Sequence, residues 1–195
     1  MEKVVLPRSV RSSLHNVGPV SWDSVFDQWR HNEEWQQRWR HCWEERGFNS
    51  WTEWRANGVA PLDPAQRSWA LYTVTDLSVV REFYGVPSRG WSDCYDGDLT
   101  RPLHTLTEHE LVRENEVVRN IMENFPLVTM LIGIVTPERI ILIDGMHRSL
   151  ALARAVVYDM LPIASVSVAL APMTEEEVTT LSSLFSTENI SGDEI

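Results

Sequence analysis

The sequence predicts an α+β fold, and three features of its 195 residues support this assignment. Two runs rich in β-branched residues, 128–135 and 139–143, flank the short segment 136–138 and indicate a β-hairpin. Helical periodicity occurs on both sides of this hairpin, over 107–124 and 146–159. With 43% hydrophobic and 23% charged residues, the chain has a globular composition and can bury a substantial core.

Tryptophan dominates the first part of the chain, because seven of the nine tryptophans lie between residues 21 and 57. Three of them recur at helical spacing and predict an amphipathic helix with one aromatic edge: Trp35, Trp39 and Trp43. Ser50 is a suitable N-cap for a second, short helix that runs to Arg55. The aromatic stripe either packs into the core or forms a surface for a protein partner or for base stacking, and the sequence leaves both uses open.

The middle of the chain gives weaker signals. Pro61 and Pro64 indicate a break, and the apolar residues of 73–84 fit neither a strand nor a helix cleanly. The segment 85–102 is rich in Gly, Pro, Ser and Asp and predicts a long loop. This loop either covers a functional site or is a solvated connector.

Clear periodicity returns after Pro102. Thr107 and Glu110 have the spacing of a capping box, which predicts a helix that runs to Asn124. After the hairpin, a helix opens at Met146, a third strand follows over 162–170, a last helix opens near residue 174, and the tail from 191 is expected to fray. We therefore expect two regions, a mainly helical Trp-rich region 1–102 and an α/β core 103–195.

Charge and composition exclude several classes of function. The net charge of −11 argues against nucleic acids and anionic membranes as partners. Lys3 is the only lysine, so a Walker loop, a strand lysine like that of protein kinases and a pyridoxal Schiff base have no residue to form them. The sequence contains no signal peptide, no CxxC pair and no run of about 18 apolar residues, and we expect a cytoplasmic protein.

The segment 140–149 contains the most informative combination of residues. A strand delivers Asp144 at its end, Gly145 permits a tight turn, and polar side chains follow in the first turn of the next helix. Free N–H groups at a helix N-terminus favour an anion, and Arg148 adds a fork that matches phosphate. His147 could contact phosphate or move a proton. Alternatively, Asp-Gly is an ordinary turn and Arg148 pairs with a nearby carboxylate, although a cation in the first turn opposes the helix dipole.

These residues resemble the ParB/sulfiredoxin-like fold, whose members bind nucleotides at this turn. The resemblance covers 106–170 and predicts a core of helix, β-hairpin, helix and strand. Met146 stands where sulfiredoxins have their cysteine, and the Gly-Glu-Arg-Arg of chromosome-partition proteins is missing. The free serine kinases are the most similar branch, because they combine Asp-Gly-His-His-Arg with a His-Glu pair, here His109 and Glu110.

The resemblance also implies roles for individual residues. Glu110 would be the general base, Asp144 would act at the substrate hydroxyl or hold Mg²⁺, and His147 would join them in catalysis. His109 would contact the substrate. The resemblance assigns nucleotide and phosphate binding to the residues of the turn itself: Gly145, Met146, His147, Arg148 and Ser149. Met146 replaces the first histidine of the family motif.

Two functions follow as hypotheses. The first is a phosphotransferase that moves a phosphoryl group from ATP or ADP to the hydroxyl of a small serine-like metabolite, with Mg²⁺ as a cofactor. The second is a nucleotide-binding module, for CTP or ATP, that regulates or recruits a protein without turnover. A nuclease is the least favoured because the chain is acidic. A homodimer is left open.

Overall fold

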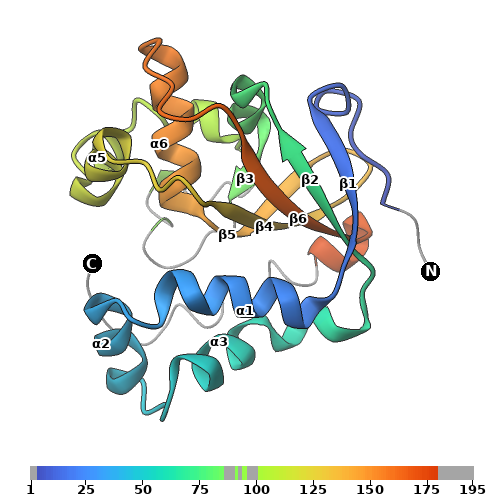
Figure 1. Ribbon diagram of the computed structural model, residues 1–195, viewed down its shortest axis with the longest axis vertical. Coiled ribbons are helices and arrows are strands. Elements are labelled where there is room, and N and C mark those ends of the chain that lie inside the picture. Colours follow the sequence, from blue (N-terminus) through green and yellow to red (C-terminus); the bar gives the residue numbers. More distant parts are fainter. Residues whose placement is uncertain (1–3, 86–90, 92–93, 96–100, 180–195) are drawn as a thin grey trace.

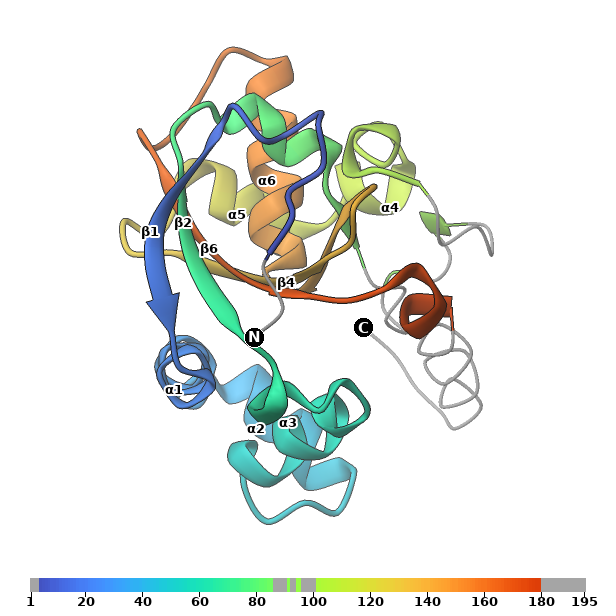
Figure 2. The same ribbon diagram turned by 90° about the vertical axis from the view of Figure 1, so that its right-hand side faces the viewer.

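The computed structural model describes residues 4–85, 91, 94–95 and 101–179. In this part of the chain, one six-stranded sheet lies between two helical layers (Figures 1 and 2). The strands are β1 (Leu14–Val20), β2 (Trp69–Val74), β3 (Tyr84–Gly85), β4 (Met130–Val135), β5 (Ile140–Asp144) and β6 (Val166–Pro172). The helices are α1 (Trp22–Glu33), α2 (Gln37–Glu45), α3 (Trp51–Val59), α4 (Glu110–Arg113), α5 (Glu116–Glu123) and α6 (Met146–Val157).

The sheet confirms the α+β class and has the strand order β1-β2-β6-β4-β5-β3. The β1/β2, β2/β6 and β4/β5 pairs are antiparallel, whereas the β6/β4 and β3/β5 pairs are parallel. Strands β1 to β3 come from the region 1–102, and β4 to β6 come from 103–195. One sheet therefore joins the two regions that the sequence analysis separated.

The two faces of the sheet carry different cores. Alternate residues of β4 point to opposite faces, as the pleat requires. Met130, Ile132 and Ile134 pack with the tryptophans of α1 to α3, whereas Leu131 and Val135 pack on the side of α6. Figures 1 and 2 show α1, α2 and α3 together on one side of the sheet and α5 and α6 on the other.

The Trp-rich segment forms three helices, where the sequence predicted two. Ser50 caps α3 as predicted, since its hydroxyl accepts a hydrogen bond from the Glu53 N–H at 3.1 Å. Trp35 lies between α1 and α2 and is 78% exposed, so the predicted stripe over Trp35, Trp39 and Trp43 is interrupted. Trp43 and Trp51 are buried, which confirms a core role for this part of the aromatic pattern.

The β4–β5 hairpin and the helix after it are confirmed. The Thr136 N–H donates to the Arg139 carbonyl at 2.9 Å, and the Thr136 hydroxyl accepts from two N–H groups of the turn. Helix α6 begins at Met146 as predicted. Strand β6 begins at Val166, four residues later than its predicted start at 162.

The predicted capping box at Thr107 is wrong. Thr107 is buried, and its hydroxyl donates to the His104 carbonyl at 3.0 Å instead of accepting from a helix N–H. His109 caps α4, which ends after four residues. The Asn115 side chain then accepts from the Val118 N–H at 3.0 Å and starts α5, so the single helix predicted over 107–124 is two helices.

Several predicted segments lie partly or wholly outside the described residues. The open segment 73–84 contains the end of β2 and a 3₁₀ helix, Leu77–Glu82. Most of the predicted loop 85–102 and the tail 191–195 fall outside the described part. The predicted last helix is present over 175–179, as far as the structure describes it. Within the described residues, no helix is both long and apolar enough to span a bilayer.

Candidate functional site

The turn between β5 and α6 depends on Gly145. This residue has φ of +95°, a conformation that side chains with a Cβ rarely adopt. A Cβ at this position would also lie 2.5 Å from Cδ2 of Leu131 in β4. Only glycine fits here, and it places Asp144 at the end of the strand directly beside the first turn of α6.

The N-terminus of α6 has hydrogen-bond donors without acceptors. No side chain in the described part of the chain caps it, and its first backbone hydrogen bond joins the Ser149 N–H to the Gly145 carbonyl at 2.8 Å. Among the described residues, no acceptor reaches the N–H groups of Met146, His147 and Arg148. These groups carry the positive end of the helix dipole and suit an anion.

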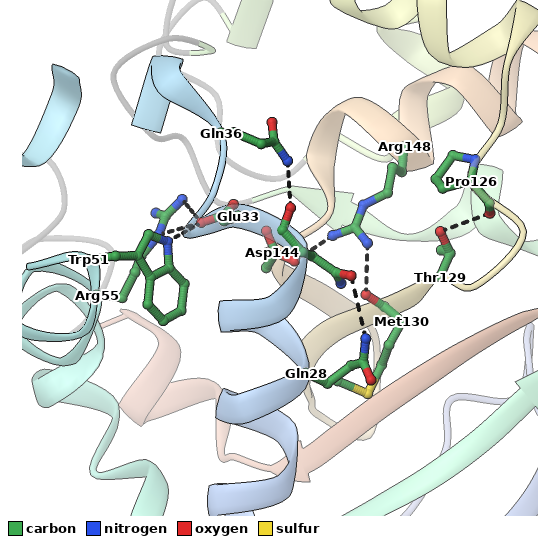
Figure 3. Close-up of polar contacts among 11 residues, drawn as sticks. Gln28, Glu33, Gln36, Trp51, Arg55, Pro126, Thr129, Met130, Asp144 and Arg148 are labelled. Atoms are coloured by element: carbon green, nitrogen blue, oxygen red, sulfur yellow. Dashed lines mark hydrogen bonds and ion pairs between the residues drawn. The ribbon is translucent and has the colours of Figure 1, made fainter. Parts of the chain in front are cut away.

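Arg148 is engaged inside the protein. One of its terminal nitrogens contacts an Asp144 carboxylate oxygen at 2.5 Å, and the other donates to the Met130 carbonyl at 3.2 Å (Figure 3). The two side chains are 13% and 9% exposed. In the described part of the chain, Arg148 is the only donor to this carboxylate. Arg148 therefore holds Asp144 in place, as the simpler interpretation of the sequence proposed.

His147 is a neutral side chain in this environment. Its ring meets the ring of Trp91 edge to face, with centroids 4.9 Å apart. Burial, together with the charge of Arg38, lowers the pKa of His147 from 6.5 to about 4. At neutral pH the imidazole is therefore uncharged, with one nitrogen as a donor and the other as an acceptor.

The other two predicted binding residues of the turn face the interior to different degrees. Ser149 is fully buried, and its hydroxyl has no hydrogen-bond partner among the described residues. Met146 is half-buried and packs against Gly85 of β3, where an added Cβ would lie 2.5 Å from the Met146 sulfur. Met146 thus contributes its backbone N–H to the turn while its side chain anchors β3.

The C-terminal end of α1 lies beside this turn, which the sequence analysis did not anticipate. Figure 3 shows Glu33 and Gln36 next to Asp144 and Arg148. Burial raises the pKa of Glu33, and the nearby charge of Asp144 raises it as well. The sequence carries a signal for this, because Trp22, Val25, Trp29 and Glu33 follow helical spacing and place one carboxylate on the apolar face.

Glu33 is neutralised by Arg55 of α3. One oxygen of Glu33 accepts hydrogen bonds from Arg55 at 2.6 and 2.9 Å and from the Trp51 indole at 2.9 Å. The Arg55 guanidinium also lies over three indole rings, at 4.0 to 4.9 Å from the centroids of Trp29, Trp39 and Trp54. Arg55 and Glu33 therefore hold the three Trp-rich helices together.

Arg38 of α2 is a second residue that the sequence analysis missed. Its Nε donates to the Gln36 side chain at 2.9 Å, and its guanidinium lies 4.7 Å from the Trp39 ring centroid. Within the described residues, it has no carboxylate partner. Its charge acts on both His147 and Arg148, which places it in the same site.

The structure does not bring all predicted residues together. Glu110 is the exposed first residue of α4, and His109 uses its side chain to cap that helix. Among the described contacts, none joins Glu110 or His109 to the turn. Asp144, His147 and Arg148 do share one site. The roles of His109 and Glu110 stay predictions.

Comparison with known proteins gives no further information. No family model, curated protein or solved structure matches this chain.

Proposed function

We propose that the protein binds the phosphate groups of a nucleotide at the N-terminus of α6. The observation that carries this proposal is that the N–H groups of Met146, His147 and Arg148 have no acceptor among the described residues. A helix of 12 residues directs its positive dipole end to this position, and no side chain of the described residues caps it. The resemblance of the turn to the nucleotide-binding turn of the ParB/sulfiredoxin-like fold suggests that the anion is a nucleotide.

The side chains around the turn suit this role. Arg148 adds positive charge while it orients Asp144, and only one carboxylate oxygen of Asp144 is used in that pair. The second oxygen has no partner among the described residues and can accept a hydrogen bond from a ligand hydroxyl. His147 and Ser149 add polar atoms that do not carry a charge.

A protein-held Mg²⁺ fits these residues poorly. Within the described part of the chain, no three His, Cys, Asp or Glu side chains lie together as metal ligands. Asp144, the predicted metal ligand, is paired with Arg148. A divalent ion would thus enter the site bound to the phosphates of the nucleotide. The protein would contribute the N–H groups at the N-terminus of α6 and the Arg148 side chain.

The proposal is tested by thermal unfolding of the purified protein with ATP, ADP, CTP or inorganic phosphate. Binding raises the unfolding midpoint by mass action, whereas adenosine and cytidine, which lack phosphate, produce no change. Arg148→Gln should weaken nucleotide binding by about 10-fold or more, since a charge-assisted contact is worth ~1.5–3 kcal/mol.

Arg139→Gln is the matched control for Arg148→Gln. It breaks a similar ion pair, with Glu175 at 2.7 Å, at the opposite end of β5 and should leave nucleotide affinity unchanged. Absence of stabilisation by any of the nucleotides at millimolar concentration would contradict the proposal.

A second candidate is the phosphotransferase that the His109-Glu110 pair suggests. The observation in its favour is the unused oxygen of Asp144, which could orient a substrate hydroxyl next to bound phosphate. In that reaction the hydroxyl oxygen bonds to the terminal phosphorus of the nucleotide, the bond from this phosphorus to its bridging oxygen breaks, and ADP leaves from ATP or AMP from ADP. Glu110 accepts the hydroxyl proton. The exposed position of Glu110 makes it accessible to a substrate but does not join it to the turn.

The assay for this activity combines ATP or ADP, Mg²⁺ and free hydroxy amino acids with the protein. Glu110→Gln should lower the rate by about 100-fold or more and leave nucleotide affinity unchanged. Glu116→Gln changes an equally exposed glutamate at the start of the next helix and should have no effect. Nucleotide binding without any phosphorylated product would leave the binding module as the function.

A further inference from the structure

We infer that Arg38 of α2 is a second phosphate-binding residue, so that the ligand is held between the Trp-rich helices and the β5–α6 turn. This inference rests on the proposed function and assigns a residue to it from the other helical layer. Neither the turn motif nor its family resemblance includes any residue of α1 to α3.

A chain of hydrogen bonds positions Arg38. Its Nε donates to the Gln36 side chain at 2.9 Å, and the Gln36 amide donates to the Asn32 carbonyl. Asn32 in turn accepts from Gln28 through its own side chain at 3.4 Å. Figure 3 shows Gln28 within α1 near Met130 and Gln36 just beyond the end of α1, on the side of Asp144. Gln36 and the Trp39 ring thus hold the Arg38 guanidinium at the start of α2.

One of the three arginines at the site has no carboxylate partner among the described residues. Arg148 pairs with Asp144, and Arg55 pairs with Glu33. Arg38 has no carboxylate partner among the described residues, although it lies close enough to Arg148 and His147 for its charge to act on both. Two guanidinium groups that share a site repel each other, and an anion bound near them removes that cost.

The unpartnered polar atoms of the site are mainly donors. They are the three N–H groups at the start of α6 and the buried Nδ2 of Asn32, for which the described residues offer no acceptor. The hydroxyl of Ser149 is a further unpartnered group, able to donate. Unpartnered donors together with an excess cation match the several acceptor oxygens of a phosphate group.

The experiment compares the affinity of three proteins for ATP and for inorganic phosphate by isothermal titration calorimetry. Wild type should bind, and Arg38→Gln should bind at least about 10-fold more weakly because it loses a charge-assisted contact. Arg40→Gln is the matched control, since Arg40 is another exposed arginine of the same helix, but it is paired with Glu44. Its affinity should equal that of wild type.

Two further measurements separate binding from folding. Arg38→Lys retains the charge without the fork and should have an intermediate affinity, with an unfolding midpoint equal to that of wild type. Hydrogen exchange tests whether the bound ligand contacts α2 as well as the β5–α6 turn. ATP should slow amide exchange in α2 of wild type and not in α2 of Arg38→Gln.

The outcomes distinguish the two proposals. Equal affinity of Arg38→Gln and wild type would overturn the role of Arg38 and leave phosphate binding at the turn intact. Absence of binding by wild type would overturn the proposed function, and with it this inference. A loss of binding in Arg40→Gln as large as that in Arg38→Gln would show a general charge effect and would also overturn the inference.

Discussion

In the described part of the chain, two arginine–carboxylate pairs are largely buried on both sides, and their degree of burial is similar. Arg55 and Glu33 are 20% and 7% exposed, and Arg148 and Asp144 are 13% and 9% exposed. Glu33 has three donors on one oxygen, and Arg55 is surrounded by indole rings. Asp144 has a single donor among the described residues and adjoins a helix N-terminus without acceptors.

This difference teaches that the surroundings of a buried ion pair, and not its depth, indicate its role. The Arg55–Glu33 pair lies among the indole rings of the Trp-rich helices and stabilises their packing. The Asp144–Arg148 pair adjoins a helix N-terminus whose first N–H groups have no acceptor among the described residues, and such an N-terminus suits an anionic ligand. Four predictions test this comparison, and they follow in order of expected effect.

The largest effect is expected when the Arg55–Glu33 pair is broken. Arg55→Ala leaves the Glu33 carboxylate buried without its cation and should lower the free energy of unfolding by ~3–5 kcal/mol. Urea denaturation measures this loss. Arg40→Ala, which removes an exposed partner of Glu44, should cost less than about 1 kcal/mol. A cost below about 1 kcal/mol for Arg55→Ala would show that the aromatic surroundings do not depend on the charge.

The next effect is the pH dependence that His147 imposes. Its pKa is about 4 in the folded chain, against an ordinary value of 6.5 for histidine, so the unfolded chain takes up the proton first as the pH falls. Above pH 6.5 this group contributes up to about 3 kcal/mol to the free energy of unfolding. The contribution is lost as the pH falls from 6.5 to 4.

Urea denaturation of wild type and His147→Gln across this range measures the contribution of His147. The raised pKa of Glu33 acts with the opposite sign, but it is common to both proteins and cancels in the difference. Bound phosphate should raise the pKa of His147, which NMR titration detects. Parallel stability curves for the two proteins would contradict the neutral, buried state of the imidazole.

A smaller loss is expected at Gly145. Gly145→Ala imposes both an unfavourable φ and a contact with Leu131, and should cost about 1–3 kcal/mol. Gly47 is the control, because its φ is +77° but a Cβ there would meet nothing within 4 Å. Gly47→Ala should therefore cost about 1 kcal/mol from backbone strain alone. Equal losses in thermal unfolding would show that the turn tolerates a side chain.

The smallest losses in the free energy of unfolding are expected at two serines near helix starts. Ser50→Ala removes the cap of α3 and should cost about 1 kcal/mol. Ser149→Ala removes a buried hydroxyl that has no partner in the described structure, so its free energy of unfolding should change by less than ~0.5 kcal/mol. A loss above about 1 kcal/mol in Ser149→Ala would show that this hydroxyl has an internal partner and is not available to a ligand.

Local signals in the sequence predicted the elements that local chemistry determines. The β-branched runs gave the β4–β5 hairpin, Asp144-Gly145 gave the start of α6, and Ser50 gave the cap of α3. Strand β1 was missed because it contains Gly18 and Pro19 and only Leu14 is buried, which is the pattern of an edge strand.

Tertiary contacts explain the remaining differences. Thr107 has the spacing of a cap, but its hydroxyl bonds to the His104 carbonyl in a buried turn, and Asn115 starts a second helix. The turn residues of the site were predicted, whereas Glu33 and Arg38 were not. Their position beside the turn follows from the packing of the Trp-rich helices on the sheet, which no local motif encodes.

The position of β6 has a consequence for biosynthesis. Although it is the last strand described in the chain, β6 lies between β2 and β4 and supplies hydrogen bonds to both. While the ribosome is still producing residues before 166, β2 and β4 each present an unpaired edge that invites aggregation. The sheet of such a nascent chain therefore closes only after residues 166–172 have been synthesised.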